Sequence, residues 1–549
     1  MPAWSRKRRT STTTAGVVFL TALTAWVRSG AVANPSGVDS FASFWSAAFQ
    51  PALQGDFLRR MVEASLTTAS FALLGTMLAV IIGVVFAPLI ASTTWDLDRI
   101  PPGARRRVAA ATRRAVWLAS VLPRAIHEFV FALVLIQILG LDPIVAIVSI
   151  GVPFGAVTAK VFADMIDGAS PEGSYALRAA GAPRMVALLA ATAPTAKRDL
   201  LSYAFYRFEC AMRSAAVLGI IGAGGLGYEL ALSFQSLRYG EVWTAIWFLV
   251  ALSGFADRWS SWVRRSDAVV TATGASSSAR SAIALVVAAP LAWWWVSPEI
   301  SRLWRPQTRS LIVDLADRAW PPATGDLGLR GLALDSLDTF VISVLAITIA
   351  ALGAVVMAFA SGGGLRAAPD HPSLLVRVIE FATRSVMLLL RAVPPPVWAF
   401  VVVLVILPGI VPGAVALGLY NLGVLGRLMA EVLENDDDAA SPSLRAAGAP
   451  SIVAFVAAAV PSIRQRWQGL TFYRWEVTVR DTVMVGTAGA TGLGRTLTLE
   501  LAGRAFDRAL AALIALVLVT LLVDELARRA ISPSSSGWRT RGERHLAST

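Results

Sequence analysis

Long apolar runs with few or no charges recur along the chain. Examples lie at residues 69–90, 337–360 and 509–523. A helix of about 20 such residues matches the hydrocarbon core of a bilayer. Hydrophobic residues make up 56% of the 549 residues and charged residues only 15%, against roughly 25% charged residues in soluble domains. The sequence therefore predicts an all-α integral membrane protein.

Clusters of glycine, proline and charge divide the apolar sequence into twelve predicted membrane helices. They lie near residues 15–29, 66–91, 115–139, 143–163, 200–222, 241–257, 281–298, 336–360, 381–407, 413–429, 467–487 and 508–528. The first is interpreted as an uncleaved helix because no clear small-residue cleavage site follows it. Lys and Arg are more abundant in the loops that a cytoplasmic amino terminus places inside. We therefore expect a multi-pass protein of the bacterial plasma membrane with both termini cytoplasmic.

The sequence repeats itself after 267 residues. LRAAGAP occurs at 177–183 and again at 444–450, and YRFECAMR at 206–213 corresponds to YRWEVTVR at 473–480. Each half contains six predicted helices, so both halves begin on the same side of the membrane. This arrangement predicts parallel repeats related by a pseudo-twofold axis along the membrane normal, with a pathway between them.

The repeat sets the expected domain boundaries. Residues 1–265 form the first repeat, residues 266–335 contain a linker with the first helix of the second half and an external loop, and residues 336–549 complete the second repeat. Within the external loop 299–335, the pattern RSLIVDLADRAW predicts a surface amphipathic helix that contacts lipid headgroups or a partner. A solvated linker between the halves is the alternative interpretation.

Both LRAAGAP copies fall in long predicted cytoplasmic loops, at 164–199 and 430–466. Leu-Arg-Ala-Ala favours a helix, and Gly181 and Gly448 permit a turn, so each loop is predicted to form short helices with a break. An ordinary connector is the alternative, but connectors rarely repeat seven residues within one chain. We interpret the loops as docking segments for a partner. The proposed coupling residues are Leu177, Arg178, Ala179, Ala180, Gly181, Leu444, Arg445, Ala446, Ala447 and Gly448.

These loops resemble the coupling loop of ATP-binding cassette importer permeases, which carries a Glu-Ala-Ala motif, a glycine and a Leu-Pro thirteen residues later. Here Gly181 precedes Pro194 by thirteen residues, and Gly448 precedes Pro461 likewise. The sequence departs from the family motif at four positions. Tyr175 and Pro442 replace the glutamate, and Ala193 and Val460 replace the leucine.

The longer combination of LRAAGAP, YRFE, an arginine four residues later and GAGGLG is similar to the phosphonate-type permeases. It covers about residues 124–230 and again 391–497. The resemblance implies a type I importer fold in which two permease domains, usually separate subunits, are joined in one chain. It also implies an ATPase dimer on the cytoplasmic face, an extracytoplasmic binding protein and an alternating-access mechanism.

An ATPase site of its own is not expected in this chain. A phosphate-binding loop needs a lysine directly after a glycine, and none of the three lysines, Lys7, Lys160 and Lys197, follows one. ATP and Mg are therefore expected on the partner ATPase, with no cofactor in this chain. His127, His371 and His545 fit no metal spacing, and no catalytic triad or paired carboxylates are evident, so neither an enzyme nor a metal site is predicted.

A glutamate and an arginine four residues apart recur inside predicted helices, as Glu209 with Arg213 and as Glu476 with Arg480. This spacing places both groups on one face of a helix, and charges at membrane depth are functional candidates. Guanidinium groups bind phosphate or phosphonate oxygens through paired hydrogen bonds. A purely structural ion pair is the alternative. The proposed pathway residues are Tyr206, Arg207, Glu209, Arg213, Tyr473, Arg474, Glu476, Arg480, Arg124 and Arg391.

The stretch VLGIIGAGGLGYEL at 217–230 matches the dinucleotide fingerprint G-x-G-x-x-G, but it closes a membrane helix instead of following a strand. Its copy has Thr491 in place of the second glycine, so the fingerprint itself is not repeated. Small residues allow a bend or close helix packing. We therefore predict an external gate formed by Gly222, Gly224, Gly225, Gly227, Gly489, Gly492 and Gly494.

The leading interpretation is a fused permease that imports phosphonate, phosphate or a related small oxyanion. An ion-gradient-driven secondary transporter is the main alternative, with Glu209 and Glu476 as coupling residues. A methionine-type importer permease is a second alternative, against which the YRFE and YRWE segments argue. No nucleic-acid partner is expected.

Overall fold

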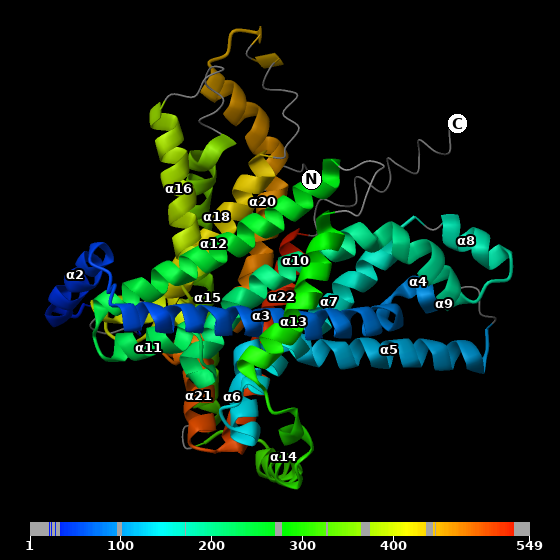
Figure 1. Cartoon of the computed structure of the whole chain (residues 1–549), viewed down its shortest axis with the longest axis horizontal. Helices are drawn as coiled ribbons and strands as arrows, with labels where there is room; N and C mark the ends of the chain where they lie inside the picture. Colours follow the sequence, from blue (N-terminus) through cyan, green and yellow to red (C-terminus); the bar gives the residue numbers. More distant parts are fainter. Residues whose placement is uncertain are drawn as a thin grey trace. The chain divides into compact units, whose positions relative to one another are not determined.

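The computed structural model describes residues 21, 24, 28, 33–95, 102–170, 172–269, 277–325, 328–363, 374–434, 443, 444 and 446–531. Regular structure within these residues is helical, apart from one isolated bridge between Ala33 and Ile406. The chain forms two compact units, one of residues 44–316 and the other of residues 1–43 with 317–549. Figure 1 shows the helices of both. The predicted all-α class is confirmed.

The unit of residues 44–316 is built around two long helices, α3 (Gly55–Ile90) and α7 (Pro143–Gly168). Glycines allow them to pack closely, because a Cβ on Gly75 would lie 2.8 Å from Ile150 and one on Gly151 would lie 2.5 Å from Leu78. Around this pair lie the helices α5 (Ala104–Ala125), α6 (Glu128–Leu139), α10 (Ala193–Leu218), α11 (Leu226–Gln235), α12 (Tyr239–Val269) and α13 (Ser277–Val296). Helix α5 runs beside α3 (Figure 1).

The second unit repeats this plan with α15 (Gly328–Ala358) packed on α18 (Ile410–Glu434). Glycines again line the contact, since a Cβ on Gly353 would lie 2.3 Å from Leu422. The remaining helices are α16 (Leu374–Ala392), α17 (Pro395–Val403), α20 (Ser451–Gly486), α21 (Leu493–Ala502) and α22 (Phe506–Ile531). Helices α11 and α21 begin and end 267 residues apart, so the sequence repeat is also a structural repeat.

By length and composition, six of the described helices can each cross a membrane, and the number rises to up to nine if each bent pair of helices counts as one span. The predicted span 281–298 is the shorter apolar helix α13, and 467–487 lies inside α20, which begins at Ser451. Most of the predicted span 15–29 lies outside the described residues.

Two predicted single spans are wrong in shape. Residues 115–139 form α5 and α6, which meet at 87°, and residues 381–407 form α16 and α17, which meet at 95°. At the first bend, Nδ1 of His127 caps α6 by accepting a hydrogen bond from the Phe129 amide at 3.1 Å. At the second, Pro394, Pro395 and Pro396 start a new helix, because proline suits the first turn of a helix but breaks its interior.

The segment before α3 belongs to the unit that contains the second repeat. Nε of Arg28 lies 2.7 Å from Oδ1 of the buried Asp338 on α15. Asn34 donates from its backbone amide to the Val405 carbonyl at 2.8 Å and from its side chain to the Leu404 carbonyl at 3.0 Å. Arg28 and Asn34 are therefore bound to the second repeat by side-chain and backbone bonds.

Candidate transport pathway and coupling segments

The two LRAAGAP segments adopt the same helix ending. After α8 (Glu172–Ala179), Gly181 has φ +90°, and the Ala182 amide donates to the Leu177 carbonyl at 3.0 Å. In the copy, Gly448 also has φ +90°, and the Ala449 amide donates to the Leu444 carbonyl at 3.1 Å. This six-to-one bond with a left-handed glycine is a helix C-cap. The predicted break at both glycines is confirmed, whereas Ser441, Pro442 and Arg445 lie outside the described residues.

The first of these segments exposes apolar side chains and is anchored to the end of α3. Tyr175, Met185, Val186 and Leu189 are all exposed. Nη1 of Arg184 donates to the Trp95 carbonyl at 2.6 Å, in the short helix α4 (Ser92–Trp95) that follows α3. This exposed apolar surface is the kind that marks a protein interaction site.

Both predicted Glu–Arg pairs form. Nη2 of Arg213 lies 3.8 Å from Oε1 of Glu209 on α10, and Nη2 of Arg480 lies 3.5 Å from Oε1 of Glu476 on α20. The two arginine side chains are mostly buried, with 15% and 19% of their surface exposed. The two repeats thus hold this pair at equivalent positions, one on α10 and the other on α20.

The neighbouring arginines, Arg207 and Arg474, are buried against different partners. Arg207 donates from Nε to the Tyr203 hydroxyl at 2.9 Å, and its guanidinium lies 4.9 Å from the Phe154 ring centroid. Arg474 donates from Nε to Oδ1 of Asn421 at 3.0 Å. Phe154 and Asn421 are aligned residues of α7 and α18, so the repeat keeps the arginine and replaces a cation–π contact with a hydrogen bond.

A buried acidic group has also changed position between the repeats. In the first repeat, the Ser214 hydroxyl on α10 donates to Oε1 of Glu128 on α6 at 2.6 Å. In the second, the residue aligned with Ser214 is Asp481, whose Oδ2 lies 3.6 Å from Nη2 of Arg474. The residue aligned with Glu128 is Pro395. Beside the position of Ser214 and Asp481, each repeat therefore has a carboxylate that comes from a different helix.

The remaining predicted pathway residues do not form matching pairs. Arg124 donates from Nε to the Ser120 carbonyl at 3.0 Å at the end of α5, whereas Arg391 is buried at the end of α16. The ring of Tyr206 lies 5.9 Å from that of Tyr203, whereas half of the Tyr473 surface is exposed. The equivalent role that the repeat suggested for the two tyrosines stays a prediction.

The glycine stretch bends the chain sharply in both repeats. Gly222 and its copy Gly489 have φ +101° and +97°, and Gly225 and its copy Gly492 have φ +77° and +94°. These left-handed values favour glycine. Gly224 also has a positive φ, +96°, whereas Thr491 at the aligned position does not. The copy can therefore have a threonine at this position, because its backbone there is not left-handed.

Two threonines outside the predicted site hold this turn. The Leu226 amide donates to Oγ1 of Thr68 on α3, and the Leu493 amide donates to Oγ1 of Thr339 on α15, both at 2.9 Å. The sequence does contain a signal, because Ser-Leu-x-Thr occurs at 65–68 and 336–339. Its two copies are 271 residues apart, whereas the other repeated residues are 267 apart.

Beyond the turn, α11 folds back against the end of α10. A Cβ on Gly227 would lie 1.8 Å from the Ala216 carbonyl oxygen, and one on Gly219 would lie 2.9 Å from the Cα of Gly227. In the copy, a Cβ on Gly494 would lie 2.7 Å from the Cα of Val483. These glycines are required by close backbone contact.

We expect Gly227→Ala to lower the free energy of unfolding by about 1 to 3 kcal/mol, because the new methyl group would overlap backbone that cannot yield without moving a helix. Thermal unfolding of the purified chain measures the loss. Gly469→Ala is the control, since nothing lies within 4 Å of that Cβ inside α20, and alanine favours a helix by about 1 kcal/mol. Unchanged unfolding of Gly227→Ala would contradict the close-contact explanation.

The linker before α14 (Pro306–Ala319) is fixed to the turn between α6 and α7. Nε of Arg302 lies 3.1 Å from Oδ2 of the buried Asp142, and its Nη1 donates to the Leu139 carbonyl at 3.2 Å. A hydrogen bond from Arg302 also holds the pKa of the Glu299 carboxyl below its ordinary value. The predicted helix in this loop is α14.

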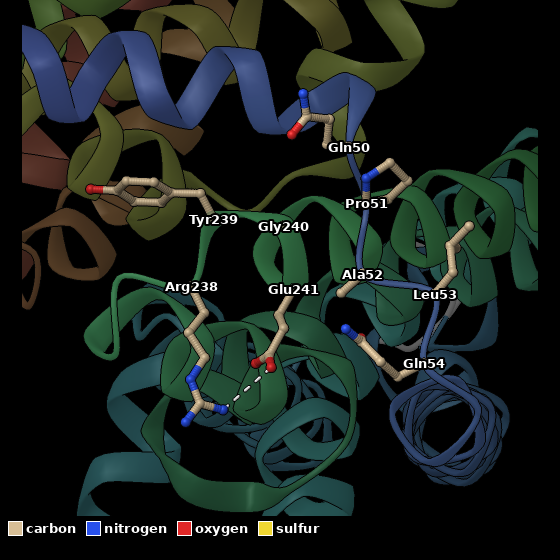
Figure 2. Close-up of a pocket in the computed structure, with 9 residues that line it drawn as sticks. All are labelled: Gln50, Pro51, Ala52, Leu53, Gln54, Arg238, Tyr239, Gly240 and Glu241. Atoms are coloured by element: carbon tan, nitrogen blue, oxygen red, sulfur yellow. Dashed lines mark hydrogen bonds and ion pairs between the residues drawn. The ribbon is translucent and has the colours of Figure 1, made fainter.

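A cavity of about 640 Å³ lies at the start of α3, away from the predicted site residues. Figure 2 shows its lining, with Gln50–Gln54 on one side and Arg238–Glu241 on the other. Nη1 of Arg238 lies 3.3 Å from Oε1 of Glu241 within it. The Ala52 amide donates to the Gly240 carbonyl at 3.2 Å and joins the two sides. Among the described residues, no group of three His, Cys, Asp or Glu side chains could hold a metal.

Comparison with known proteins agrees with the repeat. The family model of binding-protein-dependent transport system inner membrane components matches residues 102–265 and again 360–533. The chain is 26% identical over 497 residues to the phosphate-import permease protein PhnE of Mycolicibacterium smegmatis. The aligned residues cover 87% of this chain and 85% of that protein. It is 30% identical over 214 residues to the phosphite transport system permease protein PtxC of Stutzerimonas stutzeri, covering 39% of this chain and 74% of that protein.

A third relative is the putative cryptic phosphonate transport system permease protein of Escherichia coli, with 29% identity over 109 residues, 20% of this chain and 89% of that protein. No solved structure matches. The family model accounts for more than half of the chain and occurs once in each repeat. The chain therefore belongs to the family of binding-protein-dependent transport system inner membrane components, as a permease of the ATP-binding cassette importer type with two such domains fused in one polypeptide.

Proposed function

We propose that this permease carries phosphate, a phosphonate or a related small oxyanion into the cytoplasm. A separate ATPase dimer, which holds ATP and Mg, drives transport from the two LRAAGAP segments, and an extracytoplasmic binding protein delivers the substrate. Both termini lie in the cytoplasm in this proposal. The observation that carries the oxyanion assignment is the repeated pair of mostly buried arginines, Arg213 and Arg480.

The chemistry of these arginines suits a tetrahedral oxyanion. Guanidinium groups remain charged at any physiological pH and form bidentate hydrogen bonds with phosphate-like oxygens. Their distances of 3.8 and 3.5 Å to Glu209 and Glu476 exceed the about 2.7–2.9 Å of a charge-assisted hydrogen bond. An oxyanion bound at the distance of a charge-assisted hydrogen bond would be a stronger partner for each guanidinium than that glutamate. The names of three relatives, for phosphate, phosphite and phosphonate transport, point to the same substrate class.

The docking proposal rests on the exposed apolar side chains of the first coupling segment and on the identical helix ending in both. A partner that binds Tyr175, Met185 and Leu189 would cover apolar surface. A displacement of this segment by the partner would be transmitted towards α3 through the hydrogen bond from Arg184 to the Trp95 carbonyl. Two copies of the segment suit a dimeric ATPase with one docking site on each subunit.

Uptake of labelled phosphate tests the substrate class. We expect proteoliposomes that contain the chain, its ATPase and its binding protein to accumulate phosphate or methylphosphonate, with competition by unlabelled phosphite. Methionine in about hundredfold excess should not compete. Competition by methionine without any effect of the three oxyanions would reject the proposed substrate class.

A further inference from the structure

Thr68 and Thr339 make the same unusual bond in the two repeats. Each hydroxyl accepts a hydrogen bond at 2.9 Å from the first amide of the helix that follows the glycine turn, Leu226 on α11 or Leu493 on α21. Each hydroxyl also donates to the carbonyl four residues earlier in its own helix, at 2.9 and 2.8 Å. Both threonines are completely buried. Each hydroxyl thus donates one hydrogen bond within its own helix and accepts one from the next helix, and these two bonds fix its orientation.

The bond replaces a missing N-cap. The first amides of a helix have no partner within the helix, and a side-chain oxygen of the N-cap residue normally accepts one of them. Here the N-cap residues are Gly225 and Gly492, which have no side chain. Their would-be Cβ atoms lie 2.5 and 2.7 Å from the threonine hydroxyls. The glycine makes room for a cap that another helix provides.

In the first repeat, the helix that provides this cap also reaches the coupling segment. Thr68 and Ile90 are about 33 Å apart along α3 at 1.5 Å per residue. Just beyond Ile90, Asp167 on α7 accepts hydrogen bonds from the backbone amides of Ser92 and Thr93 at 2.9 Å each. The Trp95 carbonyl accepts the bond from Arg184 at 2.6 Å. Helix α3 and the adjoining α4 thus connect the coupling segment to the turn.

We propose that Thr68 and Thr339 are positioning residues that fasten the glycine turn of each repeat to its first core helix, so that a shift of this helix moves the turn. The inference rests on the proposed function in one respect, because the shift is driven by the partner ATPase. Without the hydroxyl, the turn and α11 lose their cap and move independently of α3.

The test compares Thr68→Val with wild type in the full chain, using hydrogen–deuterium exchange at the Leu226 amide. Valine keeps the size of threonine but cannot accept a hydrogen bond. We expect exchange at Leu226 to rise about five- to tenfold, as the loss of one net hydrogen bond implies, while Leu493 stays unchanged as an internal reference. Thr68→Ser should restore the wild-type rate. Thr339→Val should show the reverse pattern.

Thr76→Val is the matched control, because Thr76 is also buried in α3 but its hydroxyl donates to the Ala72 carbonyl at 2.6 Å. In the reconstituted transporter, Thr68→Val should retain ATP hydrolysis but move at least threefold less substrate per ATP than Thr76→Val. Equal exchange at Leu226 in the Thr68→Val and wild-type chains would overturn the inference, and so would an unchanged ratio of substrate to ATP. If vesicles with the wild-type transporter take up no oxyanion, the proposed function is refuted. The exchange measurement still tests the role of Thr68, because it does not depend on transport.

Discussion

The double variant Arg213→Ala with Arg480→Ala should lose at least about 99% of ATP-driven oxyanion uptake. Removing both guanidinium groups takes away the repeated positive charge on α10 and α20 that the substrate is proposed to meet. A charged hydrogen bond to an oxyanion contributes about 1.5–3 kcal/mol, and two of them account for a hundredfold effect. Initial uptake rates in proteoliposomes, normalised to the amount of inserted chain, measure the loss.

The control for this variant is a pair of the same type on the protein surface. Nε of Arg59 lies 3.0 Å from Oε1 of Glu63 on α3, and 82% of the Arg59 side chain is exposed. Arg59→Ala should transport normally. The double variant should still assemble with the ATPase, since Arg213 and Arg480 lie outside the coupling segments. Normal uptake by the double variant would reject the oxyanion role and leave the Glu–Arg pairs as structural ion pairs.

Arg474→Leu should destabilise the chain by about 3–5 kcal/mol. The substitution leaves the buried carboxylate of Asp481 without the guanidinium that lies 3.6 Å away, and it removes the hydrogen bond to Asn421. Breaking a buried ion pair by removing one partner costs about this much, because a charge remains in a poorly solvated place. Reversible unfolding of the purified chain in detergent and denaturant measures the change.

The first repeat supplies both the control and the rescue. Arg207→Leu removes the aligned arginine, which contacts two neutral groups, the Tyr203 hydroxyl and the ring of Phe154, so this variant should lose less stability than Arg474→Leu. Adding Asp481→Ser to Arg474→Leu installs the residue that the first repeat has at this position, Ser214, and should recover most of the loss. Equal destabilisation by Arg207→Leu and Arg474→Leu would contradict the role of Asp481.

Local patterns in the sequence predicted several features that the structure confirms. Glutamate and arginine four residues apart meet on one face of α10 and of α20, as helix geometry requires. Gly181 and Gly448 end helices because a left-handed residue is needed there. The glycine stretch was recognised as a bend and not a nucleotide site because Thr491 interrupts the fingerprint in its copy. The first two of these inferences depend on residues close together in the chain, and the third depends on comparing two copies of one short segment.

Features that depend on distant residues could not be predicted in this way. The bond from Leu226 to Thr68 joins residues 158 positions apart, and the threonines repeat at a different offset from the rest of the site. Arg207 on α10 contacts Phe154 on α7, whereas the aligned Arg474 on α20 contacts Asn421 on α18. This difference between the repeats depends on the packing of separate helices. The bends at His127 and Pro394 lie inside the predicted spans 115–139 and 381–407, and the change of direction depends on contacts with the neighbouring helices.

The dependence of uptake on ATP distinguishes an ATP-driven importer from an ion-driven transporter. Proteoliposomes should contain either the chain alone or the chain with its ATPase and binding protein, and each should be assayed with a proton gradient, a sodium gradient or ATP. We expect oxyanion uptake only in the complete system with ATP, and none by the chain alone under either gradient. Gradient-driven uptake by the chain alone would contradict ATP-driven import and would identify a secondary transporter.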